Sequence, residues 1–280
     1  MTTSVLVLGA GFGGLELSSR LAGALGDQVE ITLIDQADSF VFGFSKLDVM
    51  VGKRAPDEVR IAYGDLTAPQ VRFRQETIVA IHPETRHVVT DLDAYQADVL
   101  VIALGADYHV AATPGLAEVG NEFYSVAGAE AARDVLANFS AGTAIVGVCG
   151  TPFKCPPAPS EAALLLDELL RGRGVRDDVA IQVAMPFGIP IPPSPSTSEA
   201  ILARFAERDI GFLPGHKVAS LDAASHEAVL DNDARLPFDL FLGIPVHRAP
   251  EVVVESGLTQ DGWIPVDPHT LATSFPDEYA

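Results

Sequence analysis

The stretch Val5-Leu6-Val7-Leu8-Gly9-Ala10-Gly11-Phe12-Gly13-Gly14-Leu15-Glu16-Leu17 decides the fold of this chain. A short apolar run is followed by the GxGxxG spacing of Gly9, Gly11 and Gly14, and then by a helical pattern that continues to about Leu25. Strand, glycine-rich turn and helix in this order form the context of a dinucleotide-binding fingerprint. The first glycine permits a tight turn, the second lets the backbone approach a diphosphate, and the third lets the helix pack closely on the strand.

A second apolar strand, Val29-Glu30-Ile31-Thr32-Leu33-Ile34, ends in Asp35. A carboxylate at this distance from the fingerprint is suited to accept hydrogen bonds from a ribose diol. The alternative is a glycine-rich turn that holds no ligand. From these two strands we expect the following residues to contact the dinucleotide: Gly9, Gly11, Phe12, Gly13, Gly14, Asp35 and Gln36.

The identity of the dinucleotide is indicated by a later segment. Residues 98–106, Asp-Val-Leu-Val-Ile-Ala-Leu-Gly-Ala, form an apolar strand that ends in a small-residue turn. This turn resembles the segment of two-dinucleotide flavoproteins where the chain leaves the FAD domain, so FAD is favoured over NAD, with Ala103 and Gly105 as further contacts. Residues 71–89 alternate like antiparallel strands and predict a β-meander over the FAD domain, with Val79 near the cofactor.

The loop at residues 40–54 is aromatic and contains glycine. Its position after the second strand predicts that Lys53 and Arg54 lie near the cofactor, and a solvated basic pair is the alternative. We count Arg54 among the predicted cofactor contacts.

Composition excludes several function classes. The 280 residues can form one large core or two modest ones, and the formal charge of −20 argues against nucleic acid or anionic membranes as partners. Adaptation to high salt is another possible origin of that charge. The two cysteines are too few for a disulfide scaffold, and the scattered histidines predict no metal site. No apolar run is long enough to span a bilayer, and no basic segment precedes the apolar N-terminus, so we expect a cytoplasmic protein.

A second α/β unit begins with the strand at residues 144–148 and continues into a helix from about Ser160, the expected N-cap, to Arg171. Strand, proline-rich loop and helix then follow at residues 179–184, 186–195 and 198–208. Further strands are expected at 218–221, 228–230 and 238–242. The predicted fold is α/β, with two Rossmann-like dinucleotide-binding-type domains and a β-meander. The second domain, residues 108–242, is inserted in the first, residues 1–107 and 243–280.

The strand-to-helix turn of the second domain differs from the fingerprint. It reads Cys149-Gly150-Thr151-Pro152-Phe153-Lys154-Cys155-Pro156-Pro157-Ala158-Pro159-Ser160-Glu161, and its prolines remove backbone donors, so pyrophosphate binding is disfavoured. Cys155 precedes a helix and follows Lys154, and both neighbours favour a thiolate. An inert, half-buried thiol is the alternative. Cys149, at the end of an apolar strand, is expected in the core.

Three segments carry a family resemblance. Residues 151–161 resemble the cysteine segment of the flavocytochrome c sulfide dehydrogenase flavoprotein subunit and of sulfide:quinone oxidoreductases, in the FAD-dependent pyridine nucleotide-disulfide oxidoreductase superfamily. Pro245-Val246-His247-Arg248-Ala249-Pro250 is similar to their Pro-x-x-Arg-Ala loop, and Gly262-Trp263-Ile264-Pro265-Val266-Asp267 to the motif that follows it. The resemblance implies that Cys155 is the catalytic residue, that it takes up sulfur from a small sulfide substrate, and that two electrons pass through FAD to a quinone or heme-protein acceptor. His247 and Arg248 are two further candidates for residues near the flavin.

The chain departs from the family in two places. Family members pair this cysteine with a second one late in the chain, whereas no cysteine follows Cys155. Residues 274–280 end where the family has the Gly-Asp segment that binds the ribityl group and diphosphate of FAD. We therefore expect a C-terminally truncated product, in which membrane contact would require a C-terminal region found only in a full-length form. One alternative is an NAD(P)H-dependent flavoprotein of the type II NADH dehydrogenase or disulfide reductase kind, which should carry a glycine-rich second turn. Another is a non-catalytic nucleotide-binding fragment.

Overall fold

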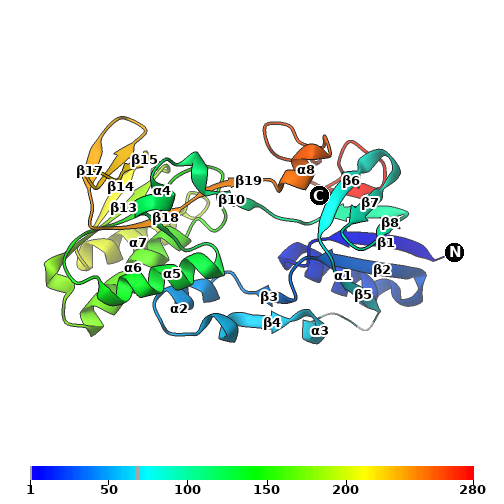
Figure 1. The fold of residues 1–280 in the computed structure, drawn as a ribbon, viewed down its shortest axis with the longest axis horizontal. Coiled ribbons are helices and arrows are strands. Elements are labelled where there is room, and N and C mark those ends of the chain that lie inside the picture. Colours follow the sequence, from blue (N-terminus) through cyan, green and yellow to red (C-terminus); the bar gives the residue numbers. More distant parts are fainter. Residues whose placement is uncertain (1, 67, 69) are drawn as a thin grey trace. The chain divides into compact units, whose positions relative to one another are not determined.

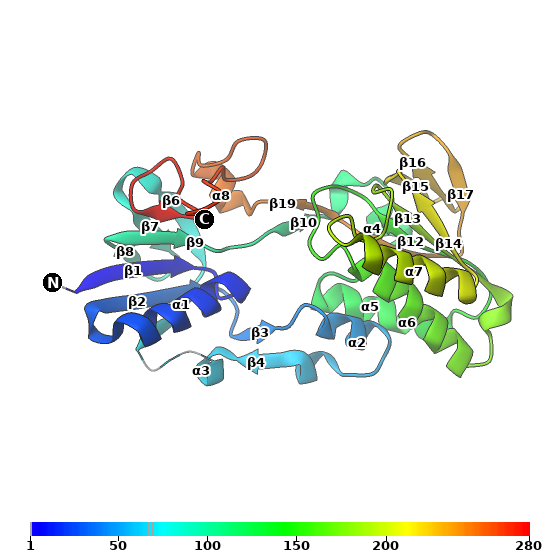
Figure 2. The ribbon, with the colours of Figure 1, turned by 180° about the vertical axis from the view of Figure 1, so that it is seen from behind.

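The computed structural model describes residues 2–66, 68 and 70–280. The chain divides into two compact units, whose elements are labelled in Figures 1 and 2. Unit 1 contains Met1–Val41, Arg60–Asp107 and Arg248–Ala280, and unit 2 contains Phe42–Val59 and Tyr108–His247.

Unit 1 is built on a parallel five-stranded sheet in the order β20-β9-β1-β2-β5. The central strand β1 pairs with β2 and β9, so that Val5 lies opposite Ile31 on one side and Val99 on the other. The helix α1 follows β1 directly. The bounds are β1 Thr3–Leu8, α1 Phe12–Leu25, β2 Val29–Asp35, β5 Val71–Gln75, β9 Val99–Ile102 and β20 Glu278–Tyr279.

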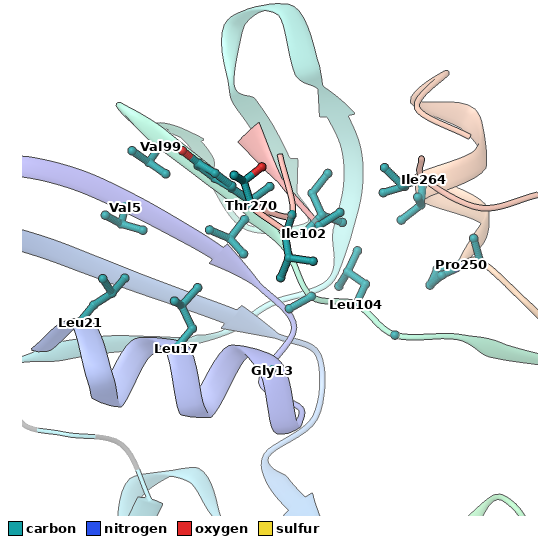
Figure 3. A pocket seen from close by; sticks show the side chains of 18 of the residues that line it. Val5, Gly13, Leu17, Leu21, Val99, Ile102, Leu104, Pro250, Ile264 and Thr270 are labelled. Atoms are coloured by element: carbon teal, nitrogen blue, oxygen red, sulfur yellow. The ribbon is translucent and has the colours of Figure 1, made fainter. Parts of the chain in front are cut away.

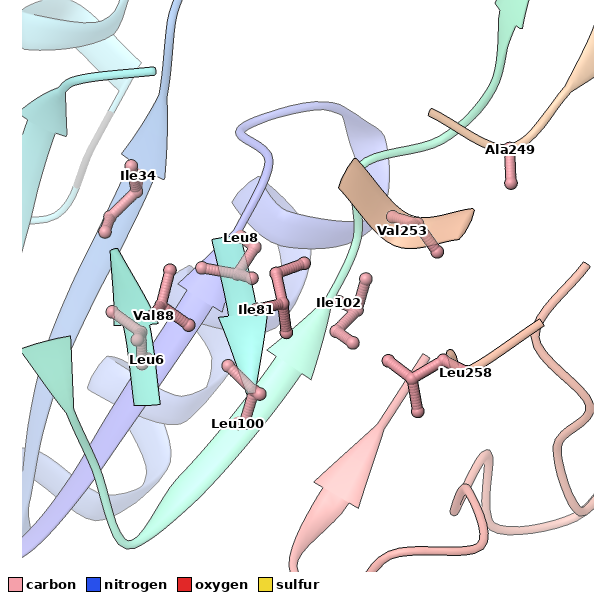
Figure 4. Close-up of a cluster of buried hydrophobic side chains, with 10 residues drawn as sticks. All are labelled: Leu6, Leu8, Ile34, Ile81, Val88, Leu100, Ile102, Ala249, Val253 and Leu258. Carbon is pink, nitrogen blue, oxygen red and sulfur yellow. The ribbon is translucent and has the colours of Figure 1, made fainter. Parts of the chain in front are cut away.

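Both faces of this sheet are buried, as expected for parallel strands. On one face Leu6, Leu8 and Leu100 pack against Ile81 and Val88 of a three-stranded antiparallel meander (Figure 4). The meander is β6 Ile78–His82, β7 His87–Thr90 and β8 Ala94–Gln96, and the short helix α8 Glu251–Glu255 packs beside it. On the other face, alternate residues of β1 and β2 pack under α1. The predicted meander is confirmed, but residues 71–75 belong to the parallel sheet.

Unit 2 repeats this path with a different sequence. Its parallel sheet has the order β11-β18-β12-β13-β14, and an antiparallel sheet β15-β16-β17 precedes β18 just as β6-β7-β8 precede β9. The two predicted Rossmann-like domains are therefore present. The bounds are β11 Asn121–Glu122, α5 Val126–Asn138, β12 Gly142–Val148, α6 Ala158–Gly172, β13 Val179–Met185, α7 Pro195–Glu207, β14 Ile210–Pro214, β15 Val218–Asp222, β16 Glu227–Leu230, β17 Arg235–Pro237 and β18 Leu240–Ile244.

The segment Phe42–Val59 differs from expectation. The sequence predicts a loop of the first domain here, but the segment forms the helix α2, Ser45–Met50, which packs on α5 of unit 2. Strands β3 Ser39–Val41 and β4 Arg60–Ala62 pair where the segment leaves and re-enters unit 1. Residues 243–247 also belong to unit 2. The remaining elements are α3 Tyr63–Leu66, β10 Asp107–His109, α4 Leu116–Val119, β19 Val246–Arg248 and the 3-10 turns Gly26–Gln28, Pro56–Val59, Pro83–Thr85, Val110–Ala112 and Arg176–Asp178.

Unit 2 also contains a buried carboxylate with three arginine partners. The Asp167 side chain on α6 is 0% exposed and accepts hydrogen bonds from Arg176 Nε at 2.5 Å, Arg208 at 2.5 Å and Arg171 Nε at 3.0 Å. Burial opposes ionisation, but the three arginines outweigh it and hold the pKa of Asp167 below its usual value. This carboxylate therefore links α6 to the 3-10 turn Arg176–Asp178 and to Arg208 at the end of α7.

Replacing Asp167 with Asn should lower the free energy of unfolding by about 3–5 kcal/mol at pH 7, because a buried arginine would lose its counter-charge. Urea unfolding followed by circular dichroism measures this loss. Because the folded-state pKa is depressed, the wild-type advantage should shrink as acid protonates the carboxyl. Asp134→Asn is the control, since that side chain is 71% exposed and its loss should change stability by no more than about 0.5 kcal/mol. Equal unfolding midpoints for the two variants would contradict the assignment.

Candidate functional site

The fingerprint turn of unit 1 is a point of close backbone approach. A Cβ on Gly9, whose φ is +94°, would lie 2.4 Å from the Ala103 carbonyl oxygen, and one on Gly14 would lie 1.9 Å from the Gly9 oxygen. The turn is fixed by the Gly9 amide, which donates to Ile34 O at 2.7 Å. A Cβ on Gly11, by contrast, would meet no protein atom within 4 Å. Two glycines are thus needed for packing, and the third leaves space for a ligand.

The N-terminus of α1 is suited to an anion. Gly11 is the N-cap and supplies no side-chain cap, and the first turn carries no acidic residue. The first amides of an α-helix have no intrahelical acceptor and lie at the positive end of the helix dipole, so this end attracts a phosphate. The turn therefore has the space and the free amides that suit the diphosphate of a dinucleotide.

Asp35 at the end of β2 has a structural contact as well as an expected cofactor contact. Its Oδ2 accepts from the Ala10 amide at 2.7 Å, and its Oδ1 accepts from the Ala37 amide at 2.8 Å. A carboxylate offers about four lone-pair sites, so acceptor capacity for a ribose diol is left. Gln36 follows and is exposed; its carbonyl accepts from the Gln75 side chain at 3.4 Å.

The other predicted cofactor residues lie in different places. Ala103 and Gly105 follow β9, where the Ala103 amide donates to Leu8 O at 2.7 Å and Gly105 has a φ of +71°. Val79 is exposed at an irregularity in the β6–β7 register, and Phe12 is exposed with its ring 5.0 Å from Phe40. All four belong to unit 1. Arg54 belongs to unit 2, where it pairs with Asp48 at 3.6 Å, so unit 1 does not itself bring it to the fingerprint.

Unit 1 also contains an apolar cavity of about 820 Å³ beside the fingerprint. Leu17 and Leu21 of α1 and Val5 and Val99 of the sheet line it, as Figure 3 shows, and Ile264 lies on its far side. Gly13, Ala103 and Gly105 also reach its wall. Among the described residues, those that line this cavity include no charged side chain, so they lack the charged donors that suit a diphosphate. The helix end is therefore better suited to a phosphate than the cavity is.

The corresponding turn of unit 2 has a different form. Residues 9–11 connect β1 with α1, whereas residues 149–157 connect β12 with α6. The helix α6 begins at Ala158 with Pro157 as N-cap, so the predicted N-cap Ser160 is wrong. Ser160 is buried inside the first turn instead, and its Oγ has no hydrogen-bond partner among the described residues. The helix begins earlier because prolines tolerate its first positions.

Cys155 lies in this connection with a φ of +59° and is half-buried. Burial raises the pKa of its thiol, and Glu161 adds to this effect; the Ala158 amide and Lys46 oppose it. The start of the following helix therefore favours the thiolate as expected, through the Ala158 amide, but burial outweighs this effect. Cys149 is 4% exposed, and burial raises its pKa to about 12, which confirms it as a core residue.

A group of side chains that we term the tyrosine–lysine cluster lies beside Cys155. Its members are Lys46 of α2, Tyr108 of β10, Tyr124, Lys154 and His247 of β19. The Tyr124 carbonyl accepts from Lys46 Nζ at 2.5 Å and from the Tyr108 hydroxyl at 3.0 Å, and the Tyr124 hydroxyl donates to Lys154 O at 2.8 Å. The sequence singles out only Lys154 and His247. The other three come from separate segments with no shared motif, so only the fold could reveal them.

His247 presents a neutral acceptor within this cluster. It is 6% exposed, and its ring lies edge-on to Tyr108 and Tyr124 with centroid distances of 5.1 and 5.4 Å. Burial lowers its pKa, with Lys154 and Lys46 adding to the effect. Nδ1 lies 2.8 Å from Pro245 O, which assigns the proton to Nδ1, and Nε2 has no partner among the described residues. Arg248 is exposed and pairs with Glu251.

The described residues also bear on metal binding and on membrane insertion. No group of three or more His, Cys, Asp or Glu side chains among them is arranged to hold a metal ion. None of their helices combines the length and the apolar character needed to cross a bilayer.

Comparisons with known proteins agree on the family. The model of the family described as pyridine nucleotide-disulphide oxidoreductase matches residues 3–280. The mitochondrial sulfide:quinone oxidoreductase of Mus musculus is 26% identical over 95% of this chain, and the alternative NAD(P)H-ubiquinone oxidoreductase C1 of Arabidopsis thaliana is 26% identical over 79%. The solved structure of the sulfide:quinone oxidoreductase from Aquifex aeolicus matches 99% of this chain with a TM-score of 0.86 and 21% identity.

Coverage of these proteins is partial. The chain spans 62% of the mouse protein, 46% of the Arabidopsis protein and 67% of the Aquifex chain. The matches confirm the family resemblance found in the sequence.

Substituting the fingerprint glycines one at a time should separate packing from ligand binding. Gly14→Ala should lower the free energy of unfolding by about 2 kcal/mol or more, because its Cβ meets the Gly9 carbonyl. Gly11→Ala should cost less than about 1 kcal/mol but weaken FAD binding by roughly tenfold or more, because its Cβ enters the ligand space. Thermal unfolding and fluorescence titration with FAD measure the two effects. Unchanged FAD affinity in Gly11→Ala would place the diphosphate elsewhere.

Proposed function

Because this chain belongs to the pyridine nucleotide-disulphide oxidoreductase family, we propose that it carries the cofactor- and thiol-bearing part of a sulfide-oxidising flavoenzyme. One observation carries the proposal: in unit 2, Cys155 lies in the connection that corresponds to the fingerprint turn of unit 1, and the tyrosine–lysine cluster lies beside it. A family member that binds two dinucleotides needs a small-residue turn at that second position. This chain instead offers a thiol held at a defined backbone position.

FAD is the cofactor that family membership implies, and unit 1 fits it. Gly9, Gly11 and the N-terminus of α1 would hold the diphosphate, and Asp35 would accept from the ribose diol. Gln36, Val79, Ala103 and Gly105 are the further contacts proposed within unit 1. When bound, FAD supplies the acceptor for the two electrons that are released when an S–S bond forms.

The proposed chemistry of Cys155 is the capture of sulfur from hydrosulfide. The Cys155 thiolate and the sulfur of HS⁻ form one S–S bond, the S–H proton leaves, and two electrons are released, which balances the step. The thiolate is the reactive form of Cys155 in this step. Because HS⁻ is also electron-rich, the S–S bond would form only with FAD as the acceptor of the two electrons. His247 Nε2, a neutral acceptor, is suited to take up a proton within the cluster. A quinone acceptor is supported by the names of the mouse and Aquifex relatives, and a heme protein is the alternative.

An NAD(P)H-dependent flavoprotein is the second candidate, since the Arabidopsis relative is an NAD(P)H-ubiquinone oxidoreductase. The turn between β12 and α6 argues against it. Four prolines occupy residues 152, 156, 157 and 159 and offer no amide to a phosphate, and a Cβ on Gly150 would already lie 2.8 Å from Val246. A non-catalytic nucleotide-binding protein, the third candidate, would be indifferent to the loss of Cys155.

Anaerobic addition of sulfide to the FAD-loaded chain tests these candidates. Sulfide should decrease the visible flavin absorbance of the wild type, and Cys155→Ser should slow that decrease by at least about a hundredfold, because the nucleophile is gone. Cys149→Ala is the matched control and should react like the wild type, since Cys149 is a core residue. Stopped-flow absorbance gives the rates.

Three other outcomes would count against the proposal. Equal rates for Cys155→Ser and the wild type would remove Cys155 from the reaction. A response to NADH and not to sulfide would favour the second candidate. No response to either donor by a chain that holds FAD would favour the third.

A further inference from the structure

The excursion of the chain through residues 42–59 delivers a lysine to the neighbourhood of Cys155. This segment belongs to unit 2, and α2 packs on α5. At its end, Lys53 pairs with Glu168 of α6 at 3.7 Å on the surface. Lys46, on α2, is half-buried, and its ammonium group donates to the Tyr124 carbonyl at 2.5 Å. The two lysines of one segment therefore have different environments.

Tyr124 connects this ammonium group to the cysteine segment. Its carbonyl accepts from Lys46, and its hydroxyl donates to the carbonyl of Lys154, the residue directly before Cys155. The Tyr108 hydroxyl also donates to the Tyr124 carbonyl and fixes it further. One tyrosine thus holds the ammonium group at one end and the cysteine backbone at the other.

Lys46 is a cation whose charge acts on Cys155. The pKa of Lys46 is lowered to about 8 by burial and by Lys154, while Glu122 and Cys155 act in the opposite direction. Lys46 in turn favours the Cys155 thiolate, which burial and Glu161 oppose. The Glu122 carboxylate is already engaged by the amides of Tyr124 and Ser125.

Two further residues of the tyrosine–lysine cluster, His247 and Lys154, interact electrostatically with Lys46. His247 is held neutral, since its pKa is lowered. Lys154 Nζ lies 4.7 Å from the centre of the Tyr108 ring, an arrangement that attracts its charge to the ring face. Burial raises the pKa of the Glu161 carboxyl, and Asp48 on α2 raises it further.

We propose that Lys46, held by the Tyr124 carbonyl, is a positioning residue whose charge stabilises the Cys155 thiolate. The inference deepens the proposed function and rests on it for the role of that thiolate. Lys46 and Cys155 then titrate as a pair, and the loss of one proton leaves either the ammonium–thiolate state or the amine–thiol state. Removing the lysine charge should disfavour the first of these, and the thiolate should form only at higher pH.

Alkylation of Cys155 by iodoacetamide, followed by mass spectrometry between pH 6 and 9.5, tests this inference. Lys46→Gln keeps a donor for the Tyr124 carbonyl but removes the charge, so alkylation at pH 7.5 should slow by at least about tenfold and its rise should move to higher pH. Lys46→Arg should restore most of the rate, because its cation persists at all these pH values. Lys53→Gln is the matched control and should follow the wild-type profile.

Cys149 reports on folding in the same samples, since it is buried and should stay unmodified. If Lys46→Gln exposes Cys149, Lys46→Met repeats the test with a side chain that keeps the apolar packing. A profile of the charge-free variant that superimposes on the wild type, or an arginine variant as slow as the glutamine variant, would overturn the inference. The alkylation assay uses neither FAD nor sulfide. If Lys46→Gln slows alkylation but the chain does not oxidise sulfide, only the proposed function is contradicted.

Discussion

The contact between three backbone segments at the fingerprint turn is the constraint on which unit 1 depends. The strands β1 and β9 and the helix α1 meet where a Cβ on Gly9 would strike Ala103 and one on Gly14 would strike Gly9. Such contact is possible only between backbones, and it orients α1 so that its first amides face outward from the sheet edge. Asp35 then fixes the same turn through the Ala10 amide. Packing and ligand geometry are thus set by the same few residues.

Unit 2 follows the same path of strands without this constraint. Its connection at residues 149–157 is longer than the fingerprint turn, and prolines restrict its backbone. A β-sheet of this order places such a connection at the carboxyl ends of its strands, where ligands bind in α/β proteins. The same architecture can therefore carry the proposed diphosphate site in one unit and the proposed thiol site in the other.

The sequence was sufficient for features that arise from near neighbours. Strand, turn and helix around Gly9, the second α/β unit, the meander and the burial of Cys149 all depend on local pattern. Features that depend on tertiary packing were missed: α2 lies in a stretch rich in aromatic residues and glycine, and Lys46, Tyr108 and Tyr124 converge from three segments. Ser160 has good capping chemistry, but Pro157 and Ala158 start the helix before it. The sequence could not show that burial and Glu161 raise the pKa of the Cys155 thiol, because both effects depend on tertiary packing.

The charge balance of the whole chain makes the cluster beside Cys155 significant. The chain has four lysines, Lys46, Lys53, Lys154 and Lys217, against a formal charge of −20, and two of the four lie in this cluster. Half-burying a lysine costs solvation, which the lowered pKa of Lys46 reflects. The neighbouring thiol bears a similar cost, since burial raises its pKa. Each group disfavours its own charge when alone, and the charged forms become compatible only when both are present. In the proposed pair, the charge of the half-buried Lys46 favours the thiolate of the half-buried Cys155, so this cysteine is more reactive than its burial alone would suggest.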